Sequence, residues 1–90
     1  MAQHRHPKNV IGPTVRKLRY GIGLSQSELA AKAQRLGWDV SRDVIAKVEN
    51  QSRWVGDFEL ILLARALGTT IEDLVSELMR AKGSKAKFSK

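Results

Sequence analysis

Apolar residues recur along most of the chain with the three-to-four-residue spacing of amphipathic helices. The first such segment begins at Val10 and carries Val15 and Leu18 about one turn apart. Pro13 is expected in the first turn, where its missing N–H is least costly. Gly23 follows the segment and suits the left-handed residue that comes after many helices. This stretch therefore predicts a first helix that ends before Gly23.

Two more helices are expected in the next part of the chain. The second begins at Ser25, which can form a capping box with Glu28. Ser41 is the natural cap of the third helix. The second helix is expected to turn inward Leu29, Ala30, Ala33 and Leu36. The third is expected to bury Val44, Ile45 and Val48.

The last two predicted helices follow the same pattern. Asp57 is expected to cap the fourth helix, and Thr70 with Asp73 to form a capping box at the fifth. The fourth helix is expected to face inward with Leu60, Ile61, Leu63, Ala64 and Leu67. The fifth is expected to do so with Ile71, Leu74, Val75 and Leu78. Five short helices and no convincing strand predict an all-α fold.

Length and composition fit one small domain. The 90 residues are expected to divide into a flexible N-terminal segment (1–9), a helical domain (10–80) and a basic disordered tail (81–90). There is no cysteine and no apolar run near the length of about 18 residues that a membrane span needs, so we expect a cytoplasmic protein. His4 and His6 have no carboxylate or cysteine neighbours, and we expect neither metal nor cofactor.

The net charge of +7 is concentrated at the two ends of the chain. Residues 1–20 and 80–90 each carry five basic residues and no acidic one, whereas six basic and nine acidic residues lie between them. Basic arms bind nucleic acid by releasing counterions, and they also occur as solubilising tails. Charge alone leaves both alternatives open.

Five short motifs occur in order along the chain: Ile-Gly at 11–12, Gly-Leu-Ser-Gln at 23–26, Ser-Arg at 41–42, Lys-Val-Glu-Asn at 47–50 and Ala-Leu-Gly at 66–68. With them, residues 11–79 resemble the helix-turn-helix domain of the Cro and phage-repressor family. The resemblance implies a five-helix, lambda-repressor-like domain whose third helix enters the major groove of DNA. The connection at residues 34–39 is about one helical turn longer than usual in the family, so the chain is similar to its long-turn branch.

The resemblance assigns base readout to the third helix. Arg42 can pair with guanine O6 and N7, and Asp43 can accept from the cytosine amino group. Ala46 and Lys47 would face the same groove, with Ala46 suited to a thymine methyl group. Two structural alternatives stay open, because Asp43 also suits the positive end of the helix dipole and Lys47 can pair with Asp43 one turn earlier.

Contacts with the DNA backbone are implied for a second group of residues. Gln26 occupies a position that contacts phosphate in the family, at a helix N-terminus that itself favours an anion. The expected backbone contacts are Gln26, Ser27, Ser41, Asn50 and Arg53.

Four large apolar residues are open to more than one interpretation. Trp38 and Trp54 are expected to cover the core as lids, and stacking on nucleic acid is the alternative. Phe58 and Leu62 lie four residues apart on the fourth helix. They either pack against Trp54 or the long turn, or form an exposed patch for a subunit or partner.

These features predict a sequence-specific transcriptional regulator that binds double-stranded DNA. We expect a repressor of prophage, mobile-element or antitoxin type, acting in the bacterial nucleoid by occupying its operator. A single reading helix buries little surface, so a homodimer on half-sites about one helical turn apart is expected, formed through the fifth helix or the Phe58–Leu62 patch.

Two other classes of function have less support in the sequence. A protein-interaction module that uses the same fold is the alternative, and a regulatory protein partner is possible for either function. No catalytic pair of side chains and no phosphate-binding glycine loop is evident, so the sequence predicts no enzyme.

Overall fold

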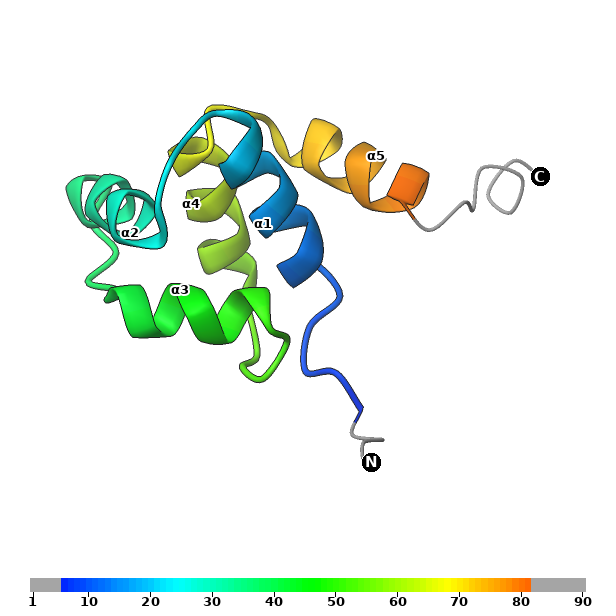
Figure 1. Cartoon of the computed structure of the whole chain (residues 1–90), viewed down its shortest axis with the longest axis horizontal. Helices are drawn as coiled ribbons and strands as arrows, with labels where there is room; N and C mark the ends of the chain where they lie inside the picture. The colour runs from blue at the N-terminus through cyan, green and yellow to red at the C-terminus, as the bar shows by residue number, and fades with distance from the viewer. Residues whose placement is uncertain (1–5, 82–90) are drawn as a thin grey trace.

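The computed structural model describes residues 6–81 and contains five helices (Figure 1). They are α1 (Gly12–Gly21), α2 (Gln26–Arg35), α3 (Arg42–Glu49), α4 (Asp57–Ala66) and α5 (Ile71–Ala81). The predicted all-α fold with five helices is confirmed. None of these described helices is long and apolar enough to cross a membrane. His4 and nearly all of the predicted basic tail lie outside the described residues.

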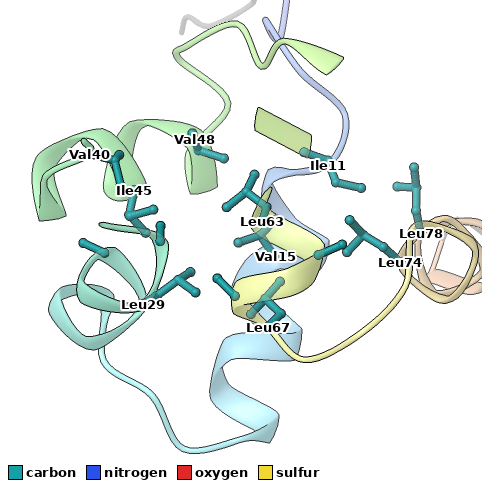
Figure 2. Close-up of a cluster of buried hydrophobic side chains, with 14 residues drawn as sticks. Ile11, Val15, Leu29, Val40, Ile45, Val48, Leu63, Leu67, Leu74 and Leu78 are labelled. Carbon is teal, nitrogen blue, oxygen red and sulfur yellow. The ribbon is translucent and has the colours of Figure 1, made fainter. Parts of the chain in front are cut away.

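The hydrophobic core lies where the five helices meet (Figure 2). Each helix contributes at least one apolar side chain with 0% exposure, among them Val15, Leu29, Ile45, Leu63 and Leu74. Burying a side chain of this size stabilises the fold by about 1.5–3 kcal/mol. Helix α3 packs against α1 and α2, whereas α5 packs against α1 and α4. In Figure 1, α2 and α3 therefore lie at one end of the molecule and α5 at the other.

The start of α1 is held by Asn9. Its Oδ1 accepts a hydrogen bond from the Gly12 N–H (2.7 Å), and its Nδ2 donates to the carbonyls of Val48 (3.0 Å) and Arg53 (2.9 Å). The Lys8 N–H also donates to a backbone carbonyl in the loop after α3. Residues 8 and 9, which the sequence placed in the flexible lead-in, therefore pack with the domain, and α1 begins two residues later than predicted.

Most predicted helix caps are confirmed. The hydroxyls of Ser25, Ser41 and Thr70 each accept from the backbone N–H three residues later. The prediction for α4 was wrong, because Gly56 is its N-cap and Asp57 is its first helical residue. The Glu59 side chain accepts instead from the Gly56 N–H at 3.1 Å. A carboxylate from within the helix therefore provides the hydrogen bond at the N-terminus of α4.

Three residues expected to face inward are exposed instead: Leu36 (40%), Ile61 (43%) and Val75 (37%). Leu36 lies just beyond the end of α2, so it leaves the buried stripe of that helix. Ile61 lies on the side of α4 away from Leu63 and Leu67. Because α4 is apolar around most of its circumference, its sequence pattern does not distinguish this side from the buried one. Periodicity alone therefore did not identify the buried face of α4.

The two tryptophans differ. Trp38 is half-buried against the core, as expected of a lid. Trp54 is 70% exposed and Phe58 78% exposed, so the prediction that Trp54 covers the core was wrong, and Phe58 is not packed under a neighbour. Leu62 is half-buried. The exposed apolar surface of α4 is thus centred on Phe58 and Ile61 rather than on Phe58 and Leu62.

Helices α1 and α3 approach each other most closely at Gly12. A Cβ atom at this position would lie 2.2 Å from the Val48 carbonyl oxygen and 2.8 Å from that of Glu49. Both obstacles are backbone atoms, which cannot move aside as the end of a flexible side chain can. The contact therefore requires glycine for steric reasons.

The substitution Gly12→Ala is expected to destabilise the fold by about 2 kcal/mol, because the added methyl group forces the two helices apart. The matched control is Gly21→Ala, where nothing lies within 4 Å of the new Cβ. That change is expected to be neutral or stabilising by up to about 1 kcal/mol, from the helix propensity of alanine. Urea unfolding of both variants checks this, and equal stabilities would contradict it.

Candidate nucleic-acid interface

Helices α2 and α3 form the pair that the sequence predicted as a helix-turn-helix, joined by residues 36–41. They pack directly on each other, and α3 lies along the lower edge of the molecule in Figure 1. Ile45 and Val48 are fully buried beneath it, whereas Arg42, Asp43 and Lys47 are exposed. Ala46 is half-buried between them. The four residues predicted for base readout therefore share the outer surface of α3, which we call the reading edge.

The reading edge contains one ion pair of its own. Lys47 Nζ lies 3.2 Å from Asp43 Oδ2, one turn away, with both side chains more than half exposed. Exposed pairs of this kind contribute only a few tenths of a kcal/mol, so DNA can replace this contact at little cost. The structural alternatives for Asp43 and Lys47 are compatible with this geometry, and their DNA contacts stay predictions.

Arg42 is positioned by the first residue of α2. Its guanidinium donates to Gln26 Oε1 at 3.0 Å, and Gln26 Nε2 donates to Glu49 Oε1 at 3.0 Å. Because Arg42 donates to the Gln26 side-chain oxygen and Glu49 accepts from its nitrogen, the orientation of the Gln26 amide is fixed. The Gln26 nitrogen keeps a second N–H, and the guanidinium keeps other donors, for contacts outside the protein. The predicted phosphate contact and the predicted guanine contact are thus joined in one arrangement.

Beneath Gln26 lies a buried ion pair between α1 and α3. Arg19 donates to the two carboxylate oxygens of Glu49 at 2.6 and 2.9 Å, with side-chain exposures of 6% and 0%. Arg19 also donates to the Leu24 carbonyl at 2.9 Å, and Arg16 lies 3.5 Å from Glu49. Burial raises the pKa of Glu49, but the hydrogen bonds from Arg19 and Gln26 outweigh it and hold that pKa below its usual value.

The start of α2 also borders an open hollow of about 700 Å³ that is lined by Arg16, Tyr20, Ser25 and Gln26, among others. The side chain of Arg16 is 47% exposed. The unpaired N–H groups of a helix N-terminus and a nearby guanidinium both favour an anion. This is the place where the sequence predicted a phosphate contact.

The other predicted backbone contacts differ in their surroundings. Ser27 is exposed, whereas the Ser41 hydroxyl already caps α3. Asn50 follows α3, and its side-chain oxygen accepts from the Ser52 N–H (3.1 Å) and hydroxyl (2.6 Å). The contacts of these three residues with DNA stay predictions.

Arg53 is already engaged within the protein. It donates to the carboxylate of Glu59 at 2.8 and 3.2 Å and to the Trp54 carbonyl at 3.0 Å. Its hydrogen bonds hold the pKa of Glu59 below the usual value. A contact of Arg53 with phosphate would have to compete with this pair, so the structure gives Arg53 a role in fixing the loop to α4.

The pairing of Arg19 with Glu49 was not predicted from the sequence. One pattern in the sequence points to them, because each stands four residues after a core residue, Val15 and Ile45 respectively. A basic and an acidic residue on the buried faces of two helices predict a buried pair.

Within residues 6–81, no group of three metal-ligating side chains is found.

The family model for helix-turn-helix proteins, HTH_3, matches residues 15–74. The chain belongs to this family. The predicted resemblance to helix-turn-helix regulators is thereby confirmed. No curated protein matches the chain in sequence.

Solved structures of helix-turn-helix proteins superpose on most of the chain. The restriction-modification controller C.AhdI from Aeromonas hydrophila is 31% identical, covers 72% of this chain and 91% of its own, and has a TM-score of 0.64. The clp gene regulator ClgR from C. glutamicum is 22% identical over 87% and 95% of the two chains, with a TM-score of 0.72. The controller C.Esp1396I, solved as a tetramer with its natural 35-base-pair operator, is 22% identical over 84% and 99%, with a TM-score of 0.66.

The substitution Glu49→Gln is expected to destabilise the protein by about 3 kcal/mol at pH 7, because it leaves the buried Arg19 charge without its partner. The loss should depend on pH. Because folding lowers the pKa of Glu49, the carboxylate stabilises the fold above its unfolded pKa of about 4.3, and that contribution is lost as the pH falls through the folded value.

Urea unfolding of the wild type and Glu49→Gln between pH 7 and pH 3 measures this difference. The difference should begin to shrink below about pH 4.3, where Glu49 of the unfolded chain takes up a proton, and it should be lost as the pH falls through the lower folded pKa. Glu72→Gln, an exposed change on α5, is the control and should alter stability by less than about 0.5 kcal/mol. A gap between wild type and Glu49→Gln that is the same at every pH would contradict the assigned role.

Proposed function

We propose that this protein is a sequence-specific DNA-binding transcriptional regulator that represses by occupying its operator. The reading edge carries the proposal. Three polar side chains that can read bases are exposed on one surface of α3, and Arg42 is hydrogen-bonded to the residue that begins α2. This arrangement lets one element meet base edges while its neighbour meets the phosphate backbone.

Each residue of the reading edge has a proposed role. Arg42 contacts guanine, since a guanidinium donates two parallel hydrogen bonds to O6 and N7. Asp43 accepts from cytosine once Lys47 moves to an acceptor on the DNA. Ala46 contacts a thymine methyl group, for which a small half-buried side chain leaves room.

Phosphate contacts fix the register of α3 in the groove. We assign them to the N-terminus of α2, through Gln26 and Ser27, and to the two ends of α3, through Ser41 and Asn50. Arg53 would join them only if its pair with Glu59 opened.

The active form is proposed to be a homodimer on double-stranded DNA in the cytoplasm. Helix α3 spans only Arg42–Glu49, and one short helix in a groove gives little contact area. Two copies on half-sites about one helical turn apart provide the remaining affinity. The similar proteins of known structure are controllers and regulators, one of them a tetramer on its operator, which supports a role of this kind. A prophage, mobile-element or restriction-type system is the proposed setting.

Selection of bound duplexes from a random library, followed by titration of the selected site, tests the proposal. Arg42→Ala is expected to weaken binding to the selected site about 10- to 100-fold, through lost contacts to a base pair. It should change binding to random duplex far less. Arg80→Ala is the matched control, since it removes a basic side chain on α5, at the other end of the molecule from α3.

Affinity for the selected site should fall steeply between about 50 and about 200 mM salt, as phosphate contacts require. Binding that is flat with salt, or no binding at low salt, would contradict DNA recognition and favour the alternative, a protein-interaction module. An equal loss of affinity for the selected site in Arg42→Ala and Arg80→Ala would contradict the assignment of Arg42 to base readout.

A further inference from the structure

The outer side of α4 is an apolar surface bounded by two opposite charges. Phe58 and Ile61 are exposed on it, with Asp57 at the N-terminal end and Arg65 at the C-terminal end. These four residues lie on the side away from Leu63 and Leu67, which are buried in the core. We call them the α4 face.

The α4 face and the adjacent Trp54 carry the two most exposed large apolar side chains of residues 6–81. Phe58 is 78% exposed, Ile61 43%, and Trp54, which precedes α4, 70%. Because an aromatic side chain can bury about 150–250 Å², Phe58 and Trp54 together leave on the order of 300 Å² open. That is the size of patch that is often functional on a monomer. Two copies would bury about 600 Å² from these aromatics alone, half of what a specific interface of about 1,200 Å² requires.

The charges at its ends distinguish this surface from a random apolar patch. Within residues 6–81, neither Asp57 nor Arg65 has an ion-pair partner, whereas Glu59 and Glu77 are both paired with basic side chains. Arg65 borders a shallow hollow that is also lined by Lys32 and Arg35, so that end of the surface is basic. Ile61 stands midway, four residues from each charge.

We infer that the α4 face binds the α4 face of a second copy of this chain, with the two helices antiparallel about a two-fold axis near Ile61. In this arrangement Asp57 of each copy meets Arg65 of the other, and Phe58 and Ile61 pack between the two ion pairs. A two-fold interface uses the same patch on both subunits and must be self-complementary. A face with one acid and one base equidistant from its centre meets that requirement.

The alternative surface for dimerisation, α5, offers less apolar area. Its core residues Leu74 and Leu78 are buried within the same chain, and Val75 is only 37% exposed. The α4 face is the more exposed of the two. This inference deepens the proposed function by naming the surface through which two reading edges would be joined.

Sedimentation equilibrium without DNA tests the inference on the full chain, over about 1 to 500 micromolar protein. The wild type is expected to dimerise, and Phe58→Glu to be monomeric, because it places two carboxylates in the apolar centre. Phe58 is largely exposed, so this variant should keep its fold, which circular dichroism verifies. Glu72→Arg, a charge reversal on α5, is the control and should dimerise like the wild type.

Charge reversals test the antiparallel arrangement itself. Asp57→Arg and Arg65→Asp are each expected to weaken dimerisation at least about tenfold, since each places like charges together at both ends. Asp57→Arg should weaken dimerisation more, because the new arginine faces Arg65 of the other copy, near its Lys32 and Arg35. An equimolar mixture of the two variants should form heterodimers, and the double variant Asp57→Arg/Arg65→Asp should recover dimerisation, because both restore opposite charges.

A monomeric wild type, or dimerisation unaffected by Phe58→Glu, would overturn the inference. Dissociation by Phe58→Glu without rescue in the mixture or the double variant would overturn the antiparallel arrangement. These measurements are made without DNA. Dimerisation can therefore prove absent while Arg42→Ala still weakens binding to the selected DNA site. The reverse result, dimers of the expected kind without specific DNA binding, would count against the proposed function alone.

Discussion

The ion pair between Arg19 and Glu49 is the interaction on which the rest of the structure depends. Two charges buried between α1 and α3 are costly to remove from water, and they are tolerated only because each is paired and hydrogen-bonded. Glu49 also accepts from Gln26, whose amide oxygen in turn accepts from Arg42. One buried carboxylate thus connects the start of α2 and the start of α3. The geometry of the reading edge is set from inside the domain.

The packing around this pair leaves little freedom to α3. Glycine at position 12 allows the backbone of α1 to approach the last turn of α3, and Asn9 holds both that turn and the following loop by hydrogen bonds. The core residues Ile45 and Val48 fix the inner side of α3. A helix held at its first residue, its inner side and its end presents its outer side rigidly. Rigid positioning lowers the cost of ordering side chains when DNA binds.

The surfaces of the domain differ in chemistry. The reading edge carries Arg42 and Lys47, and Arg16 of α1 lies beside the start of α2, so basic side chains gather at this end of the domain. The outer side of α4 is apolar, with a single charge at each end. A surface of the first kind suits DNA, and a surface of the second kind suits another copy of the chain. The two proposals therefore rest on different residues.

The sequence by itself determined the five helices, most of their caps and the residues of the reading edge. These features are local: a capping serine and its N–H lie three residues apart, and the exposed side of α3 follows from the spacing of Ile45 and Val48. Only the tertiary structure decided that Arg19 meets Glu49, 30 residues away, and that Ile61 and Trp54 remain exposed. Helix α4 is apolar around most of its circumference, so its own pattern does not say which side is covered. The helices that pack against α4 determine which of its sides is buried.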